Sequence, residues 1–247
     1  MTGHPGHGEA LWRCSLSSVD RANLAAIKMT KASPAQQALR FRSWGGARPG
    51  AGRKALRRLG RVPHVSRPVH RARHPVHLTL RFASGLPSLR SQVIGGLIRR
   101  AFKDTWRRWF RVVHHSIQTN HLHLLVEAED SKALSRGASA LIIRIARRLN
   151  ALLGRKGAVF PERYHGHELT TPREVRHALA YVLLNAHRHS VIQHGLDPYS
   201  SGTTFDGWRD IATQGRAPPA APPKTWLLAI GWRRHGLIGS WERPGGK

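Results

Sequence analysis

Residues 110–130, FRVVHHSIQTNHLHLLVEAED, contain two strand patterns that follow each other directly in the chain. Phe110–Gln118 is rich in apolar and β-branched residues, and leucines follow histidines at the start of the second pattern, Leu122–Glu127. The dipeptide Thr119-Asn120 between the two patterns is typical of a hairpin turn. This stretch therefore predicts an antiparallel β-hairpin.

Periodic patterns continue on both sides of the hairpin. Apolar and polar residues alternate over residues 76–82, which indicates a half-buried strand. Apolar residues recur at helical spacing over 88–109 and over 131–153, so each segment is expected to form an amphipathic helix. Residues 158–169 fit either an irregular segment or an edge strand.

The last periodic element has a well-marked start. Thr171 is an N-cap residue, Pro172 occupies the first helical position and Glu174 completes a capping box. An apolar stripe then runs from Val175 to Ala186. These features predict a helix with its stripe against the core.

The order of elements points to one fold class. It runs strand, helix, strand, strand, helix, edge strand, helix, and one small antiparallel sheet with helices packed on a single face satisfies it. We therefore predict an α+β, ferredoxin-like domain over residues 75–192. Residues 1–74 and 193–247, the latter with a proline-rich linker, are expected to be basic, largely disordered flanks.

The composition restricts the class of partner. The 247 residues carry a formal net charge of +28, which implies a polyanionic partner, most often nucleic acid. Cys14 is the only cysteine, which excludes a disulfide framework, a cysteine-based zinc site and an iron–sulfur cluster. Neither a signal peptide nor a membrane span is evident, so we expect a cytoplasmic, nucleoid-associated protein with no membrane partner.

Basic residues of two regions are the candidates for DNA contact. The tail segment GGARPGAGRK and the residues after it can track phosphates from a Gly/Pro hinge, although a solvated cationic linker would have the same composition. The candidates in the tail are Arg48, Arg53, Lys54, Arg57 and Arg58, and those in the predicted domain are Arg81, Arg144, Arg148 and Arg188.

Two histidines of the hairpin are candidate metal ligands. In a strand, His121 and His123 point to one face, where two imidazoles can chelate a divalent ion. Polar residues on a solvated sheet face would show the same spacing. With 17 histidines in the chain, a His-x-His spacing is also expected by chance. His165 and His167 form a second pair in a less regular segment, and His187/His189 a third at a helix end, where the side chains diverge.

The last predicted helix carries a candidate nucleophile. Tyr181 lies off the apolar stripe, and Asn185, four residues later, projects on the same side with a potential carbonyl ligand. A rim tyrosine and a solvated asparagine are the alternative interpretations. A tyrosine hydroxyl can attack phosphorus where a divalent ion such as Mg²⁺ or Mn²⁺ offsets the phosphate charge and stabilises the leaving oxygen. Such a set would give a 5′-phosphotyrosine and a free 3′-OH on single-stranded DNA.

Residues 75–192 resemble the HUH tyrosine transposases, in particular the REP-associated tyrosine transposases and their TnpA-like relatives. The resemblance rests on the first strand HPVHLTLR (74–81), the strand NHLHLLVE (120–127), and ALAYVLLNAHRHSV (178–191), which is similar to the Tyr-x-x-x-Asn helix of the family. The segment GGARPGAGRK also resembles one that precedes such domains.

This resemblance implies roles for four residues. His121 and His123 correspond to the metal-binding pair, Tyr181 to the nucleophile and Asn185 to the third ligand. It also implies an HUH endonuclease-type domain that nicks single-stranded or hairpin-forming DNA and transfers the strand in DNA transposition. Where the family often has Asn-Pro-Val-Arg, this chain has Asn-Ala-His-Arg at 185–188, so its helix is expected to continue further.

Two other functions fit parts of the sequence. A basic α+β module derived from such a transposase, and kept only to bind nucleic acid, would have the same charge and fold. A metal hydrolase that activates water would use carboxylates, and Glu127 shares the face of His123, where it is a candidate ligand or support of a ligand. Whether the protein is a monomer or a homodimer stays open.

Overall fold

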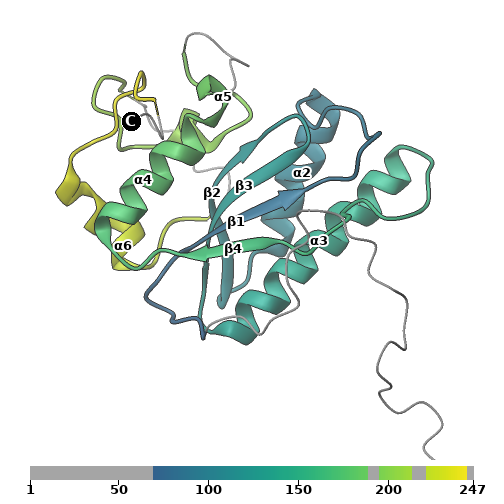
Figure 1. Cartoon of the computed structure of the whole chain (residues 1–247), viewed down its shortest axis with the longest axis horizontal. Helices are drawn as coiled ribbons and strands as arrows, with labels where there is room; N and C mark the ends of the chain where they lie inside the picture. Colours follow the sequence, from purple (N-terminus) through teal and green to yellow (C-terminus); the bar gives the residue numbers. More distant parts are fainter. Residues whose placement is uncertain (1–68, 189–194, 213–220, 244–247) are drawn as a thin grey trace, which may run out of the picture. The chain divides into compact units, whose positions relative to one another are not determined.

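The computed structural model describes residues 69–188, 195–212 and 221–243, all of which belong to one compact unit. Figure 1 shows these residues as a coloured cartoon. The five basic residues predicted in the tail, from Arg48 to Arg58, lie outside the described residues, and so does most of the proline-rich linker.

The sheet has the predicted α+β, ferredoxin-like topology. Its strands are β1 (Val76–Arg81), β2 (Phe110–Ile117), β3 (His121–Ala128) and β4 (His165–Glu168), in the order β2-β3-β1-β4. All three neighbouring pairs are antiparallel. The hairpin predicted from residues 110–130 is therefore confirmed as β2 and β3, and the segment 158–169 contains an edge strand.

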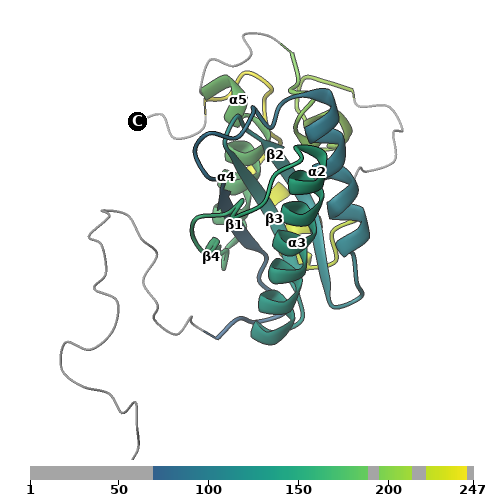
Figure 2. The same cartoon turned by 90° about the vertical axis from the view of Figure 1, so that its right-hand side faces the viewer.

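Two long helices pack on one face of this sheet, as predicted. They are α2 (Gln92–Thr105) and α3 (Ser131–Leu152), which lie side by side in Figure 2. Ile98 and Leu141 join Leu78 and Leu124, an opposed pair on neighbouring strands, in a fully buried cluster. Helix α2 is shorter than the predicted segment because Ser91 caps its start and the chain leaves the helix at Trp106.

The third long helix lies on the opposite face, so the prediction of helices on a single face holds only for α2 and α3. Helix α4 (Pro172–Leu183) has the predicted Thr171 capping box. Its apolar stripe packs against Val113 and Leu125, which are apolar residues on the second face of the hairpin. Because β2 and β3 are apolar on both faces, the sheet is covered on both sides, and Figure 1 shows it between α4 and the other two helices.

The described parts of both flanks also pack onto the domain. In the C-terminal segment, α6 (Trp226–Ala229) and the short 3-10 helix η2 (Gly231–His235) pack on α4, and the 3-10 helix η1 (Ser201–Thr204) packs on β2. The buried aromatic residues of this segment are Phe205, Trp208 and Trp232. On the N-terminal side, His70 is buried and bonds to the Ala128 carbonyl and to Glu168. These residues form part of the fold, in contrast to the predicted disordered flanks.

None of the helices in the described ranges is both long and apolar enough to cross a lipid bilayer.

Candidate active site

The candidate metal ligands lie at the start of β3, on the face covered by α4. The Nε2 atoms of His121 and His123 are 3.1 Å apart. The Asn120 side-chain oxygen lies 2.8 Å from Nδ1 of His121, so this nitrogen donates and a neutral ring keeps its lone pair on Nε2. The strand alternation predicted from the sequence therefore brings two imidazole nitrogens to one point.

The separation of these nitrogens fits two ligands of one divalent ion. Nitrogen atoms bound at about 2.1 Å from a metal, at right angles to each other, lie about 3 Å apart. Among the described residues, no group of three or more His, Cys, Asp or Glu side chains is placed to hold a metal ion. A site at this point therefore has two protein nitrogens and needs a ligand of another kind to complete it.

Helix α4 brings Tyr181 to the same histidines. The ring centroid of Tyr181 lies 5.0 Å from that of His123 and 5.7 Å from that of His77, with both contacts edge-on. The side chain is half-buried, because the stripe of α4 turns Leu179 and Val182 into the core and leaves Tyr181 beside it. Tyr181 and the His121/His123 pair, far apart in the sequence, thus lie in one cluster.

His77 belongs to this cluster although the sequence analysis gave it no role. Its Nε2 lies 3.2 Å from Nδ1 of His123, and Thr79 Oγ1 lies 3.3 Å from the same nitrogen. Burial first, and then the neighbouring His167 and His165, lower the pKa of His77 to about 4, so the ring is neutral at neutral pH. The alternation of β1 could have indicated this position of His77 from the sequence. Antiparallel pairing puts Thr79 opposite His123, and His77, two residues before Thr79, lies on the same face.

Asn185 is fully buried just beyond the end of α4. The helix stops at Leu183 and, after one turn residue, a short helix α5 (Asn185–Arg188) follows, so the chain continues helically with a break. Neither amide atom of Asn185 has a hydrogen-bond partner among the described residues. An unpaired buried amide costs about 1–3 kcal/mol, and in a native structure it calls for an explanation such as a missing ligand.

Glu127 holds the C-terminal segment. Its carboxylate accepts hydrogen bonds from the backbone N–H groups of Lys224 and Thr225 and from the Thr225 hydroxyl, at 2.8–3.0 Å. Arg111 lies 3.6 Å from the second oxygen. With both oxygens engaged by the segment that leads into α6, Glu127 acts as a structural anchor, and the alternative that it serves a metal site is not supported.

The remaining predicted residues lie in different places. Arg81 is exposed at the end of β1, directly opposite His121. Arg144 donates to the Thr105 hydroxyl and Arg148 pairs with Asp104, so both fasten α3 to the end of α2. Arg188 ends α5, and its side chain is outside the described part.

Of the alternative histidine pairs, His165/His167 lies on β4 beside His77 and Thr79, and His189 of the pair His187/His189 lies outside the described residues. His165 and His167 are exposed on β4, and His167 is paired in register with His77. His187 donates to the Gly195 carbonyl at 2.9 Å. A cavity of about 670 Å³ opens beside Tyr181 and is lined by His77, His167 and residues of α4 and of the C-terminal segment.

Comparison with known proteins gives a likeness among solved structures and none among sequence families. No family model matches the chain, and no curated protein matches its sequence. A solved structure of a REP-associated tyrosine transposase bound to a REP hairpin is similar to it, with 16% sequence identity and a TM-score of 0.46. The similarity covers 57% of this chain and 82% of that one.

Proposed function

We propose that this protein is a single-stranded DNA transposase or endonuclease in which Tyr181 attacks a DNA phosphodiester. The supporting observation is the cluster on the α4 face of the sheet. There the ring of Tyr181 lies 5.0 Å from that of His123, whose Nε2 is 3.1 Å from Nε2 of His121. A protein that only binds DNA has no need to bring a tyrosine to a histidine pair of this kind.

The proposed cleavage needs only the groups of this site, the DNA and water. The Tyr181 oxygen forms a bond to phosphorus, the bond from phosphorus to the 3′ oxygen breaks, and the phenolic proton passes to water. The departing 3′ oxygen takes up a proton, which leaves a 5′-phosphotyrosine and a 3′-OH. A later attack of a 3′-OH on the phosphotyrosine joins the strands and restores the tyrosine.

His121, His123 and Asn185 are the proposed ligands of a divalent ion, Mg²⁺ or Mn²⁺. When bound, such an ion offsets the negative charge of the phosphate and polarises it. The Asn120 contact orients His121, and His77 and Thr79 contact the other nitrogen of His123. Asn185 is included because it is buried without a partner near the end of the helix that carries Tyr181.

Affinity for DNA is proposed to come mainly from charge. The chain carries +28, and Arg81 is exposed opposite His121, which supports its proposed role as a contact of the DNA strand. The tail residues from Arg48 to Arg58 and Arg188 remain proposed phosphate contacts. Arg144 and Arg148 are weaker candidates because they already hold protein groups.

The experiment is adduct formation on a labelled single-stranded DNA hairpin with Mg²⁺ or Mn²⁺, analysed on a denaturing gel. Tyr181→Phe should abolish the adduct, since it removes the attacking oxygen and keeps the ring. Tyr164→Phe and Tyr199→Phe are the matched controls, because Tyr164 is buried in the core and Tyr199 is packed against the Arg90 guanidinium. Both control variants should form the adduct normally.

Variants of the histidine pair separate chemistry from binding. His121→Ala and His123→Ala should lose the adduct but retain DNA affinity, since affinity comes mostly from phosphate contacts. An adduct that persists in Tyr181→Phe contradicts the proposal. A wild-type protein that binds hairpins tightly and never forms an adduct supports the alternative, a transposase-derived protein that only binds DNA.

A further inference from the structure

The C-terminal segment forms one wall of the cavity beside Tyr181. The cavity of about 670 Å³ is lined on one side by His77, His167 and α4, and on the other by Glu242 and Arg243. Its size is within the range of about 300–1,000 Å³ that is typical of small-ligand sites. The wall is contributed by a part of the chain in which the sequence analysis placed no functional residue.

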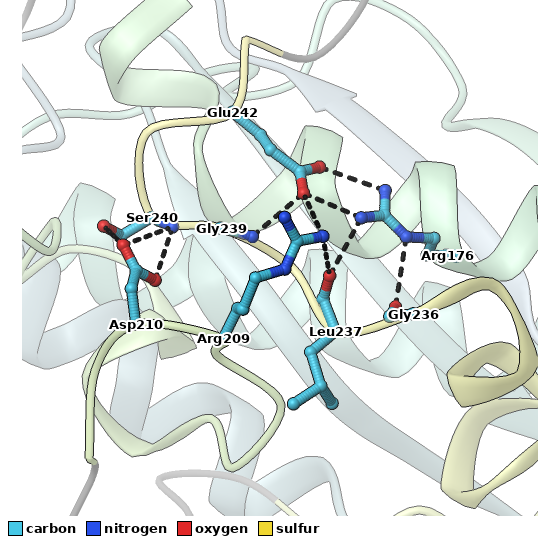
Figure 3. Close-up of polar contacts among 8 residues, drawn as sticks. All are labelled: Arg176, Arg209, Asp210, Gly236, Leu237, Gly239, Ser240 and Glu242. Carbon is cyan, nitrogen blue, oxygen red and sulfur yellow. Dashed lines mark hydrogen bonds and ion pairs between the residues drawn. The ribbon is translucent and has the colours of Figure 1, made fainter.

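Arg176 of α4 clamps this wall in place. Its guanidinium makes two hydrogen bonds to the Glu242 carboxylate, at 2.7 and 3.0 Å, and two more to the carbonyl oxygens of Gly236 and Leu237 (Figure 3). The Gly239 N–H also donates to Glu242. One arginine thus fixes four acceptors of the segment that approaches the cavity.

A second contact fixes the same segment from the other side. Asp210 accepts hydrogen bonds from the backbone and the hydroxyl of Ser240, and Arg209 lies 3.6 Å from Glu242 (Figure 3). Partial burial, the largest single influence, would raise the pKa of Glu242. Its bonds to Arg176 and Gly239 and the charges of Arg176 and Arg209 outweigh this and lower the pKa. The clamp is therefore charged at neutral pH.

The lining combines apolar residues with an exposed arginine, Arg243. Leu169, Ala178 and Ala180 are buried apolar residues of this lining, to which Tyr181 also belongs. His167, His177 and Arg243 are exposed in the lining, and of these three Arg243 carries a permanent positive charge. The two carboxylates of the lining are engaged elsewhere, Glu174 by Thr170 and Thr171 and Glu242 by Arg176.

We propose that this cavity binds one unpaired nucleotide of the DNA strand, with the base against the apolar part of the lining at Ala178 and the phosphate toward Arg243. A flat base suits apolar residues next to an aromatic ring, and a phosphate suits the exposed Arg243 guanidinium. The inference rests on the proposed function, since it places this nucleotide next to the phosphate that Tyr181 attacks. The clamped C-terminal segment is then part of the substrate site.

The test measures binding of deoxyadenosine 5′-monophosphate and of 2-deoxyribose 5-phosphate to the full chain by calorimetry. The nucleotide should bind at least about tenfold more tightly than the sugar phosphate, which lacks the base. Ala178→Phe, which fills the apolar part of the lining, should remove this difference. Arg243→Ala should weaken both ligands several-fold, whereas Arg173→Ala, an exposed arginine of α4 outside the cavity lining, should change neither.

Equal affinity for the two ligands in the wild type overturns the inference, and so does a base preference that survives Ala178→Phe in a protein with a native circular dichroism spectrum. Arg243 is exposed, so its variant keeps the test valid if Ala178→Phe does not fold. An Arg243→Ala protein that binds both ligands like the wild type also contradicts the inference. Adduct formation, measured separately, reports on the proposed function, so the two can fail independently.

Discussion

Replacing Gly137 by alanine tests how closely α3 approaches the hairpin that carries the histidine pair. A Cβ atom at Gly137 would lie 2.1 Å from Cγ of Phe110 and 2.3 and 2.5 Å from the two adjacent ring carbons. Carbon atoms in ordinary contact are about 3.5–4.0 Å apart. Phe110 is 0% exposed at the start of β2, so its ring has no open space into which it can move.

The expected change is the sum of two opposing effects. Alanine in place of glycine within a helix stabilises it by about 1 kcal/mol. Overpacking a buried contact costs about 1–3 kcal/mol or more, and an overlap on three ring atoms belongs at the upper end. We therefore expect Gly137→Ala to lower the free energy of unfolding by about 2 kcal/mol, which corresponds to a fall in Tm of about 4–8 °C for a domain of this size.

Gly96→Ala is the matched control. Gly96 is also inside a helix, α2, but a Cβ there meets no atom within 4 Å. This variant should raise the stability by about 0.5–1 kcal/mol, because only the helix propensity changes. Thermal and urea unfolding followed by circular dichroism measure both. A Gly137→Ala protein as stable as the wild type, or two variants that change in the same direction, would refute the close approach of α3 to β2.

Three further predictions concern pH, an anchor and salt. Burial lowers the pKa of His115 to about 3 and that of His114 to about 4, so below pH 6.5 the unfolded chain binds protons that the folded one does not. Urea unfolding at pH 7.5, 6 and 5 should therefore show that the free energy of unfolding falls as the pH decreases. Each of these histidines contributes about 1.4 kcal/mol per pH unit, and His115→Leu should reduce this dependence of stability on pH. Glu127→Gln should lower the free energy of unfolding by about 2 kcal/mol, because it removes the negative charge of the group that accepts hydrogen bonds from the Lys224 and Thr225 N–H groups. It should leave Mn²⁺ affinity unchanged, and a loss of Mn²⁺ binding would instead make Glu127 a ligand. Deleting residues 1–68 should reduce the salt dependence of single-stranded DNA binding by about 0.7 in the log–log slope for each phosphate that the tail neutralises, and an unchanged slope would remove the tail from the binding surface.

Local patterns in the sequence were sufficient for much of the fold. The hairpin, the start of α4 at Thr171 and the core helices α2 and α3 follow from strand alternation, helical spacing and capping. The position of His121 next to His123 on one face follows from the period of two residues in a strand. The placement of Tyr181 off the apolar stripe follows from the helical period.

The C-terminal wall of the cavity could not be predicted from local patterns, because it is held by single contacts between residues that are distant in the sequence. Phe205, Trp208 and Trp232 are buried against α4, but they are isolated in a segment without periodicity. The Arg176–Glu242 clamp joins a helix to a loop, which no spacing rule predicts. The sequence therefore indicated a flank where the structure has a packed layer.

By itself the sequence determined which residues share a face within each strand and helix, because those relations depend on backbone periodicity over a few residues. Only the tertiary structure decided that α4 covers the face opposite to α2 and α3, and so meets the histidines. That choice depends on Val113 and Leu125, which make the second face of the sheet apolar enough to bury a helix. The contact of Tyr181 with His123 and His77, and the complete burial of Asn185, are consequences of this packing and not of any local pattern.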